Sequence, residues 1–316
     1  MDSKARNRRL KRIAFGVIVV AGLITIAAYG FPRISLWHGL HSQSGNLVVS
    51  LGVTPGAAPL YSVNKETSSV TLLTLPVKGK NHSVIDMVKA ADGSTYYLVA
   101  ESTKPVSNLY KKGVDGTITA LTNSGTMKYN LSYDAKSQKL AYQELMFTNA
   151  QDFVSNNQWD LVLYDLQEGT GSTVAKGMNP VLMPGGEGIL YENGSNIIFE
   201  DLNTSATTSV LQLPENEPYA ISPDVKTIAA YNLTTHAIDE YELVNGASPN
   251  YVRSIPAKIR PLVLAYVNGT LLGGYAAQKD GTVKYSFSDP SIGNLNGITV
   301  DGITSAAPQR MYAYEP

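Results

Sequence analysis

The sequence predicts an all-β protein with the architecture of a β-propeller, preceded by one transmembrane helix. Three observations carry the propeller prediction: short strand-like segments recur along the chain, tight-turn dipeptides separate them, and the pattern repeats about every 40–50 residues. The helix prediction rests on an uncharged N-terminal segment that directly follows a cluster of basic residues.

The N-terminal segment predicts a membrane anchor. Residues 13–31 (IAFGVIVVAGLITIAAYGF) carry no charge, and a helix of this length spans about 28 Å, close to the thickness of a bilayer core. Basic residues precede it: Lys4, Arg6, Arg8, Arg9, Lys11 and Arg12. The positive-inside rule keeps such a flank in the cytoplasm. We therefore expect a cytoplasmic stub over 1–12, a signal anchor over 13–31 and an extracytoplasmic remainder, in a single-pass protein of the plasma membrane.

Two alternatives to a retained anchor stay open. A signal peptide has an apolar core of about 7–15 residues, shorter than this one. Residues 29–33 offer no small-x-small cleavage pair, but Ala27 and Ala28 leave a cleavage site possible in principle. A buried core helix is the second alternative. The chain has no cysteine, so it is not a lipoprotein.

Charge and cysteine content narrow the function classes. The first 33 residues hold seven of the 25 basic residues and one of the 26 acidic residues, so the rest of the chain has a net charge near −7. Such a domain lacks the clustered Lys and Arg that bind nucleic acid. Without cysteine there is no disulfide framework and no thiol catalysis, and stability must come from a large core.

The strand-like segments beyond the anchor are rich in Val, Ile, Leu, Tyr and Thr. In chain order they are NLVVSLG (46–52), PLYSV (59–63), STYYLVA (94–100), KLAYQEL (139–145), DLVLYDL (160–166), GILYENG (188–194), TIAAYNL (227–233) and TLLGGYA (270–276). The turn dipeptides are Asp92-Gly93, Asp115-Gly116, Asn193-Gly194, Asn268-Gly269 and Asp280-Gly281. Gly and Asn tolerate the positive φ that tight hairpin turns require.

The spacing of the turns predicts the number of blades. The markers Asn46, Asp92, Asp134, Gly185, Asp224 and Asn268 lie 46, 42, 51, 39 and 44 residues apart. A polar insertion, FTNAQDFVSNNQ (147–158), accounts for the longest interval. We expect six blades over residues 45–316 after a linker over 32–44, with RMYAYEP (310–316) pairing with residues 46–52 to close the ring. A seventh blade from residues 291–316 and another all-β arrangement are the alternatives.

One segment carries a family resemblance. SPDVKTIAAY (222–231) resembles the repeat core of TolB-type (WD-like) β-propellers, and YDAKSQKLAY (133–142) and MPGGEGILY (183–191) resemble degenerate copies. The chain departs from the repeat at Val225, where the family has glycine. The resemblance implies the fold; propellers of this type serve as scaffolds, periplasmic binding modules and gating domains of peptidases.

The search for catalytic residues yields few candidates. His38 and His41 have a spacing that can share a metal, but they lie in the linker, and His82 and His236 fit surface positions. The acidic candidates for the central channel are Asp86, Asp152 and Glu217, and capping of turns is the alternative role. The chain has no G-x-S-x-G elbow, P-loop or EF-hand loop, and neither Trp37 nor Trp159 lies in a sialidase box. We therefore expect no catalytic residue, no cofactor and no metal site.

Tyrosine is the overused residue type, with 19 copies. Five lie beside predicted inner strands or rim loops: Tyr96, Tyr97, Tyr129, Tyr133 and Tyr219. Tyrosine is common in recognition surfaces because it buries a large area and keeps a polar group. We consider these five as a binding surface, with packing between blades as the alternative that accounts for most tyrosines.

These observations favour a membrane-anchored extracytoplasmic propeller that works as a binding or scaffold module. Its partners would be the lipid bilayer, through the N-terminal helix, and an envelope protein or glycan. Two alternatives stay open: a propeller hydrolase acting on a glycan or lactone, with a pair of acidic residues or calcium in the channel, and an accessory subunit of a membrane assembly machine.

Overall fold

The computed structural model describes a β-protein. Its described residues are 35–36, 46–51, 59–64, 70–100, 106–145, 159–213, 217–244, 249–267, 269–279, 282–290, 298–300 and 308–313. These residues form strands and turns and contain no helix. No membrane-spanning helix occurs among them, and the predicted stub and anchor, residues 1–12 and 13–31, lie outside them.

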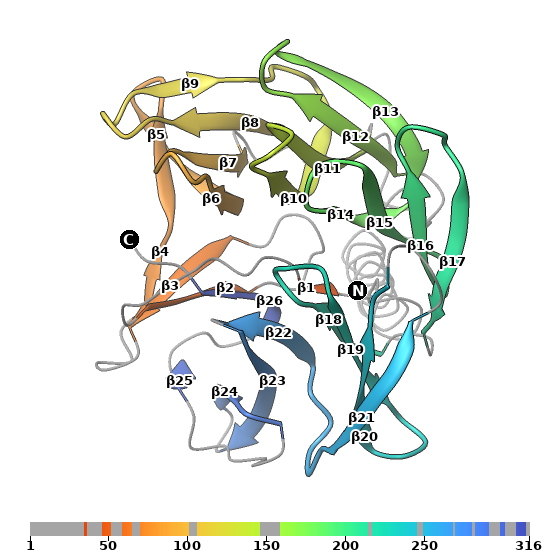
Figure 1. The fold of residues 1–316 in the computed structure, drawn as a ribbon. Helices are drawn as coiled ribbons and strands as arrows, with labels where there is room; N and C mark the ends of the chain where they lie inside the picture. The colour runs from red at the N-terminus through yellow and green to blue at the C-terminus, as the bar shows by residue number, and fades with distance from the viewer. Residues whose placement is uncertain are drawn as a thin grey trace, which may run out of the picture.

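The described strands form six sheets arranged around a centre, as in a β-propeller (Figure 1). The first three sheets, with their strands in the order in which they pair, contain β26 (Pro308–Ala313), β2 (Asn46–Leu51), β3 (Leu60–Asn64) and β4 (Val70–Leu72); β5 (Thr74–Val77), β6 (Lys80–Lys89), β7 (Thr95–Ala100), β8 (Ser107–Lys112) and β9 (Ile118–Ala120); and β10 (Met127–Asp134), β11 (Lys139–Leu145), β12 (Asp160–Asp165) and β13 (Thr170–Lys176).

The other three sheets continue around the ring. They contain β14 (Met178–Leu182), β15 (Gly188–Asn193), β16 (Asn196–Asp201) and β17 (Thr207–Gln212); β1 (Ser35–Leu36), β18 (Tyr219–Ile221), β19 (Thr227–Asn232), β20 (Ala237–Glu242) and β21 (Asn250–Pro256); and β22 (Val263–Val267), β23 (Thr270–Lys279), β24 (Thr282–Ser288) and β25 (Ile298–Val300).

Both ends of the propeller meet in one sheet. Strand β26 pairs antiparallel with β2, with Val48 opposite Tyr312. This confirms the predicted pairing of the C-terminal strand with residues 46–52, which removes an exposed sheet edge. Within the predicted linker, β1 pairs in parallel with β18, at the inner edge of its sheet, a strand that the sequence did not predict.

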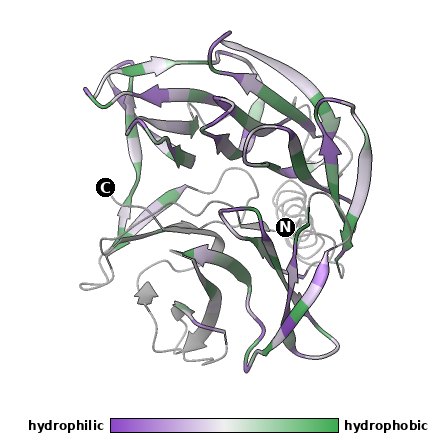
Figure 2. Ribbon diagram, in the orientation of Figure 1, coloured by the Kyte–Doolittle hydropathy of each residue, from purple (hydrophilic) through white to green (hydrophobic). Residues whose placement is uncertain are grey.

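Burial decreases from the inner to the outer strands. Every residue of β14 and β22 is buried, whereas the outer strands β13 and β21 are largely exposed. Hydrophobic and hydrophilic stretches both occur along the described strands (Figure 2), and strands such as β7 and β15 are buried on both faces, to which successive side chains point in turn. The hydrophobic side chains fill the spaces between neighbouring sheets.

Turns and bulges set the register of the hairpins. Gly93 and Gly194 have φ values of 84° and 59° in the predicted turns, the conformation that favours glycine. Val225, at the position where the resembled repeat has glycine, also has a positive φ of 57°. Two inner strands carry a bulge around a left-handed asparagine: Asn130 in β10 (φ 58°) and Asn179 in β14 (φ 54°).

Candidate functional site

Buried polar side chains connect three consecutive sheets near their inner strands. We call the set Asn130, Gln143, Asn179, Glu192 and Tyr219 the inner polar chain; all five are buried. The two bulges place Asn130 and Asn179 so that the Asn130 side-chain amide donates to the side-chain oxygens of both Asn179 and Gln143. Buried polar groups persist when they are hydrogen-bonded, so this chain is suited to fixing one sheet against the next.

The chain continues across the next interface. The Asn179 side-chain amide donates to Glu192 Oε2 over 2.9 Å, and the Tyr219 hydroxyl donates to the same oxygen over 3.1 Å. The backbone N–H of Asn179 donates to Gln143 Oε1 over 2.8 Å. The members of the inner polar chain hydrogen-bond to one another, which indicates that the chain has a structural role.

A pocket of about 370 Å³ lies over one face of the β10–β13 sheet. We call it the β10–β13 pocket. Its floor comes from β10 to β13 and its rim from the segment that joins β9 to β10; the lining residues are Thr122, Ser124, Thr126, Lys128, Tyr142, Glu144, Asp160, Val162, Tyr164, Gly171 and Thr173. This volume falls in the range typical of small-ligand sites.

A row of alternating charges crosses the floor of the pocket. Strand register places Lys128 opposite Glu144, Glu144 opposite Asp160, and Asp160 opposite Lys176. Lys128 Nζ lies 3.4 Å from Glu144 Oε1, and Lys176 Nζ lies 2.5 Å from Asp160 Oδ1. Cross-strand neighbours share a face of the sheet, so the row places two carboxylates side by side between two ammonium groups.

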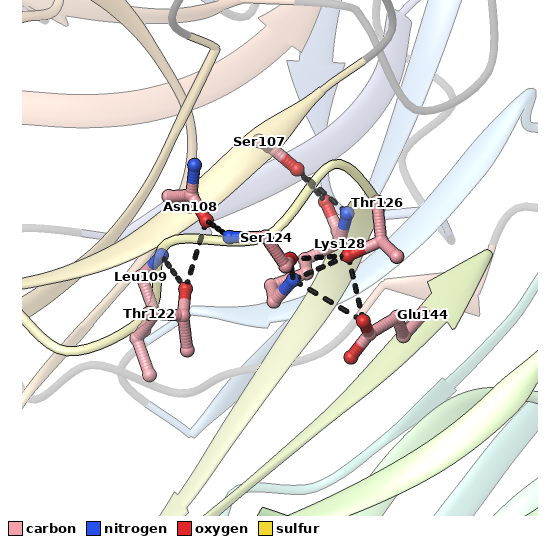
Figure 3. Close-up of polar contacts among 8 residues, drawn as sticks. All are labelled: Ser107, Asn108, Leu109, Thr122, Ser124, Thr126, Lys128 and Glu144. Atoms are coloured by element: carbon pink, nitrogen blue, oxygen red, sulfur yellow. Dashed lines mark hydrogen bonds and ion pairs between the residues drawn. The ribbon is translucent and has the colours of Figure 1, made fainter. Parts of the chain in front are cut away.

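Lys128 is almost completely buried, with 1% of its side chain exposed. Its Nζ donates to Ser124 Oγ over 2.5 Å, to Thr126 Oγ1 over 2.6 Å and to Glu144 Oε1 over 3.4 Å (Figure 3). An ammonium group has three protons, so these three acceptors occupy all of them. Burial lowers the pKa of Lys128, and Glu144 opposes this shift.

The rim segment is held in place by a second set of hydrogen bonds. Asn108 Oδ1 accepts from the Ser124 backbone N–H over 2.9 Å and from the Thr122 hydroxyl over 3.1 Å (Figure 3). Ser107 Oγ accepts from the Lys128 backbone N–H over 2.6 Å. The neighbouring sheet therefore positions both the rim and the buried lysine.

Tyr142 differs from the other polar groups around the pocket. It is 2% exposed, lines the pocket, and forms no hydrogen bond with any residue of the described part of the chain. Lys128 Nζ lies 5.8 Å from the centre of its ring. Burial and the neighbouring Glu144 raise the pKa of its hydroxyl. The hydroxyl lines the pocket rather than the closed interior, which makes it a candidate contact for a ligand.

The five candidate tyrosines do not form one cluster. Tyr96, Tyr129 and Tyr133 pack in the core between the β5–β9 and β10–β13 sheets, and the rings of Tyr96 and Tyr133 lie 5.6 Å apart. Tyr97, on the opposite face of β7, and Tyr219 pack in two other clusters. Their role as a binding surface stays a prediction.

The acidic and histidine candidates occupy separate places. Asp86 is fully buried, and its carboxylate accepts from the backbone N–H groups of Met87 and Leu131 over 2.8 Å each. Glu217 accepts two hydrogen bonds from the Arg260 guanidinium. His236 is exposed, as predicted, and His82 is half-buried. Asp152, His38, His41 and the anchor flank Arg8, Arg9, Lys11 and Arg12 lie outside the described residues.

The sequence reasoning did not identify Lys128, Tyr142, Glu144 or Asp160. The available signal was the spacing of Tyr142 and Glu144 on one predicted strand and of Asp160 and Tyr164 on the next. Residues an even number of positions apart lie on the same face of a strand, so each pair shares a face. No group of three or more His, Asp or Glu residues in the described ranges is arranged to hold a metal ion.

Solved structures with the same arrangement of strands are β-propellers. TolB from Acinetobacter baumannii superposes with a TM-score of 0.52 at 14% identity, covering 84% of this chain and 67% of TolB. This chain has a TolB-like β-propeller fold. Oligogalacturonate lyase from Vibrio parahaemolyticus gives 0.52 at 15% identity, covering 87% of this chain and 77% of the lyase.

One further solved structure is similar to this chain, and two other comparisons found no match. An oligogalacturonate lyase in complex with manganese gives a TM-score of 0.50 at 14% identity, covering 75% of this chain and 69% of that one. No protein-family model matches the sequence, and no curated protein matches it either. The TolB-like propeller is therefore a statement about fold alone.

Proposed function

We propose that this protein is a membrane-anchored extracytoplasmic β-propeller that acts as a binding module for a glycan or protein of the cell envelope, with the β10–β13 pocket as its ligand site. The observation that carries the proposal is the Tyr142 hydroxyl, which lines the pocket and has no hydrogen-bond partner in the described part of the chain. A ligand that supplies the missing hydrogen bond would stabilise the bound state.

The anchor part of the proposal rests on residues 13–31 and their basic flank. In this proposal the six sheets are the six blades of the extracytoplasmic domain. The absence of cysteine from the whole chain allows a clean topology test, because an introduced cysteine is unique. In intact cells or spheroplasts, a membrane-impermeant maleimide should label Thr234→Cys, an exposed turn position, and should label Ser3→Cys only after lysis. The opposite labelling pattern would contradict the proposed topology.

Ligand binding is tested with a pocket-filling variant and a matched control. Thr173 is an exposed residue of an outer strand that lines the pocket, and Thr208 is an exposed threonine on the outer strand of the next sheet. The full-length chain is titrated with a panel of neutral, acidic and amino-sugar oligosaccharides, and is cross-linked in its native membranes. We expect a ligand whose binding Thr173→Trp weakens at least about tenfold and Thr208→Trp leaves unchanged. No binding, or equal binding by all three proteins, would refute the pocket as the ligand site.

A hydrolase is the second candidate function, because Glu144 and Asp160 lie directly opposite each other. Paired carboxylates are the machinery of glycoside hydrolysis, in which one of them must act as an acid. Here both carboxylates are already engaged in ion pairs with lysines. This argues for binding over turnover. Release of reducing sugar from the same panel, abolished by Asp160→Asn, would favour the hydrolase instead.

A further inference from the structure

We infer that the β10–β13 pocket takes a neutral polyhydroxyl ligand, a sugar without carboxylate or amino groups. The inference rests on the proposed binding function and adds the chemical class of the ligand. It follows from the charges of the pocket, from its free donors and acceptors, and from the way Lys128 is enclosed.

The charges around the pocket balance once Lys176 is counted; it does not line the pocket but is paired with the lining residue Asp160. Lys128, Glu144, Asp160 and Lys176 form one row across the sheet with two positive and two negative groups. A charged ligand placed over this row would gain attraction from one pair of groups and repulsion from the other. A neutral ligand avoids the desolvation cost of a charge that the pocket does not compensate.

The free groups are mainly acceptors. Glu144 uses Oε1 to accept from Thr126 and Lys128, and Asp160 uses Oδ1 toward Lys176. The second carboxylate oxygen of each residue has no partner among the described residues. Hydroxyl groups on neighbouring carbons of a sugar are suited to donate to two such oxygens on adjacent strands, and hydrogen bonds to ionised groups are the stronger kind.

An anionic ligand would not find a free donor on Lys128. Ser124, Thr126 and Glu144 already accept its three protons, and its side chain is 1% exposed. An acidic sugar would instead meet the two carboxylates. A cationic ligand would meet carboxylates whose charge is already compensated at 3.4 Å and 2.5 Å by the two lysines.

The Tyr142 hydroxyl then completes the site as the group that recognises one sugar oxygen. Its ring lies in the floor, in the same row as Val162 and Thr173, next to the charge row. A sugar ring presents both a hydroxylated edge and an apolar face, so it matches a floor of this mixed kind.

The test compares three probes built on one ring. Galactose, galacturonate and galactosamine oligomers of equal length, and the corresponding glucose series, are titrated against the full-length chain by isothermal calorimetry. We expect the neutral oligomer of at least one series to bind at least about tenfold more tightly than its acidic and amino counterparts. Tyr142→Phe should weaken that binding about fivefold, and Thr208→Trp should leave it unchanged.

The outcomes separate this inference from the proposed function. Tighter binding of the acidic or amino series, blocked by Thr173→Trp, would overturn the neutral ligand but keep the binding site. Binding of a neutral sugar that neither Thr173→Trp nor Tyr142→Phe weakens would place the site elsewhere and overturn both. An absence of binding by all six probes would overturn the neutral-sugar inference and, with a negative membrane cross-linking result, the binding function.

Discussion

The inner polar chain and the β10–β13 pocket are two polar regions that differ in how their tyrosine hydroxyls are bonded. In the chain, Tyr219 is 1% exposed and its hydroxyl donates to Glu192. In the pocket, Tyr142 is 2% exposed and its hydroxyl has no hydrogen-bond partner in the described part of the molecule. Both tyrosines are buried to the same degree, so burial does not separate a structural hydroxyl from a functional one; hydrogen bonding does.

This difference has a physical consequence for stability and for binding. Removing a group from the inner polar chain leaves other buried groups unpaired, and the folded state bears that cost. Removing the Tyr142 hydroxyl, which faces the pocket without a protein partner, should leave the fold intact and remove an interaction made only with a ligand. The two regions should therefore respond in opposite ways to comparable substitutions.

The largest effect is expected at Asn179, the residue with the most partners in the inner polar chain. Asn179→Ala removes its bonds with Asn130 and Glu192 and places alanine at a φ of 54°. Each orphaned buried group costs about 1–3 kcal/mol, so the free energy of unfolding should fall by about 3 kcal/mol or more. Denaturant unfolding measures this. Asn203→Ala, at an exposed turn, should change it by less than about 0.5 kcal/mol; equal losses in the two variants would remove the structural role of the chain.

The next effect concerns the buried lysine of the pocket. Glu144→Gln leaves Lys128 buried without its carboxylate, which should lower the free energy of unfolding by about 2 kcal/mol. Lys128→Met combined with Glu144→Gln should restore most of this loss, because no uncompensated charge then remains. Lys176→Met removes a largely exposed partner of Asp160 and should cost at most about 1 kcal/mol. A double variant less stable than Glu144→Gln would contradict the pairing.

A smaller effect on the free energy of unfolding is expected when the hydroxyls of the two tyrosines are removed in turn. Tyr219→Phe should lower the free energy of unfolding by about 1–2 kcal/mol, because Glu192 loses a donor. Tyr142→Phe should leave stability nearly unchanged, because its hydroxyl lines the pocket and makes no hydrogen bond with the described residues. Thermal unfolding of both variants, together with ligand titration, checks whether the two substitutions differ in this way. Similar destabilisation by the two substitutions would show that Tyr142 is also structural.

The sequence predicted the features that depend on local chemistry and on long repeats. Positive φ at Gly93 and Gly194 follows from turn composition, and the pairing of β26 with β2 follows from the need to close the ring. The TolB-like fold followed from the repeat around residues 222–231. These features need no knowledge of exact strand register.

The charge row could not be predicted because it depends on a bulge. Counting back from the turn between Asp134 and Lys139 without a bulge places Tyr129 opposite Glu144 and puts Lys128 on the other face. The left-handed Asn130 shifts the register by one residue, which brings Lys128 opposite Glu144 instead. A shift of one residue exchanges the two faces of a strand. The sequence therefore could not show that Lys128 faces the pocket, whereas Tyr129 packs in the core.

The smallest effect expected is a dependence of stability on pH that belongs to the pocket alone. Because burial lowers the pKa of Lys128, the unfolded chain keeps the lysine proton at pH values where the folded protein has released it. The free energy of unfolding should therefore rise with pH in the window between the lowered pKa and the usual lysine value of about 10.4. The comparison is made between pH 8 and pH 9, where unfolded tyrosines, with a pKa of about 10, are still largely protonated. Lys128→Met should flatten this rise, and Lys226→Met, whose side chain is 76% exposed, should retain it. Equal slopes in the wild type and Lys128→Met would show that the lysine keeps its proton throughout this range.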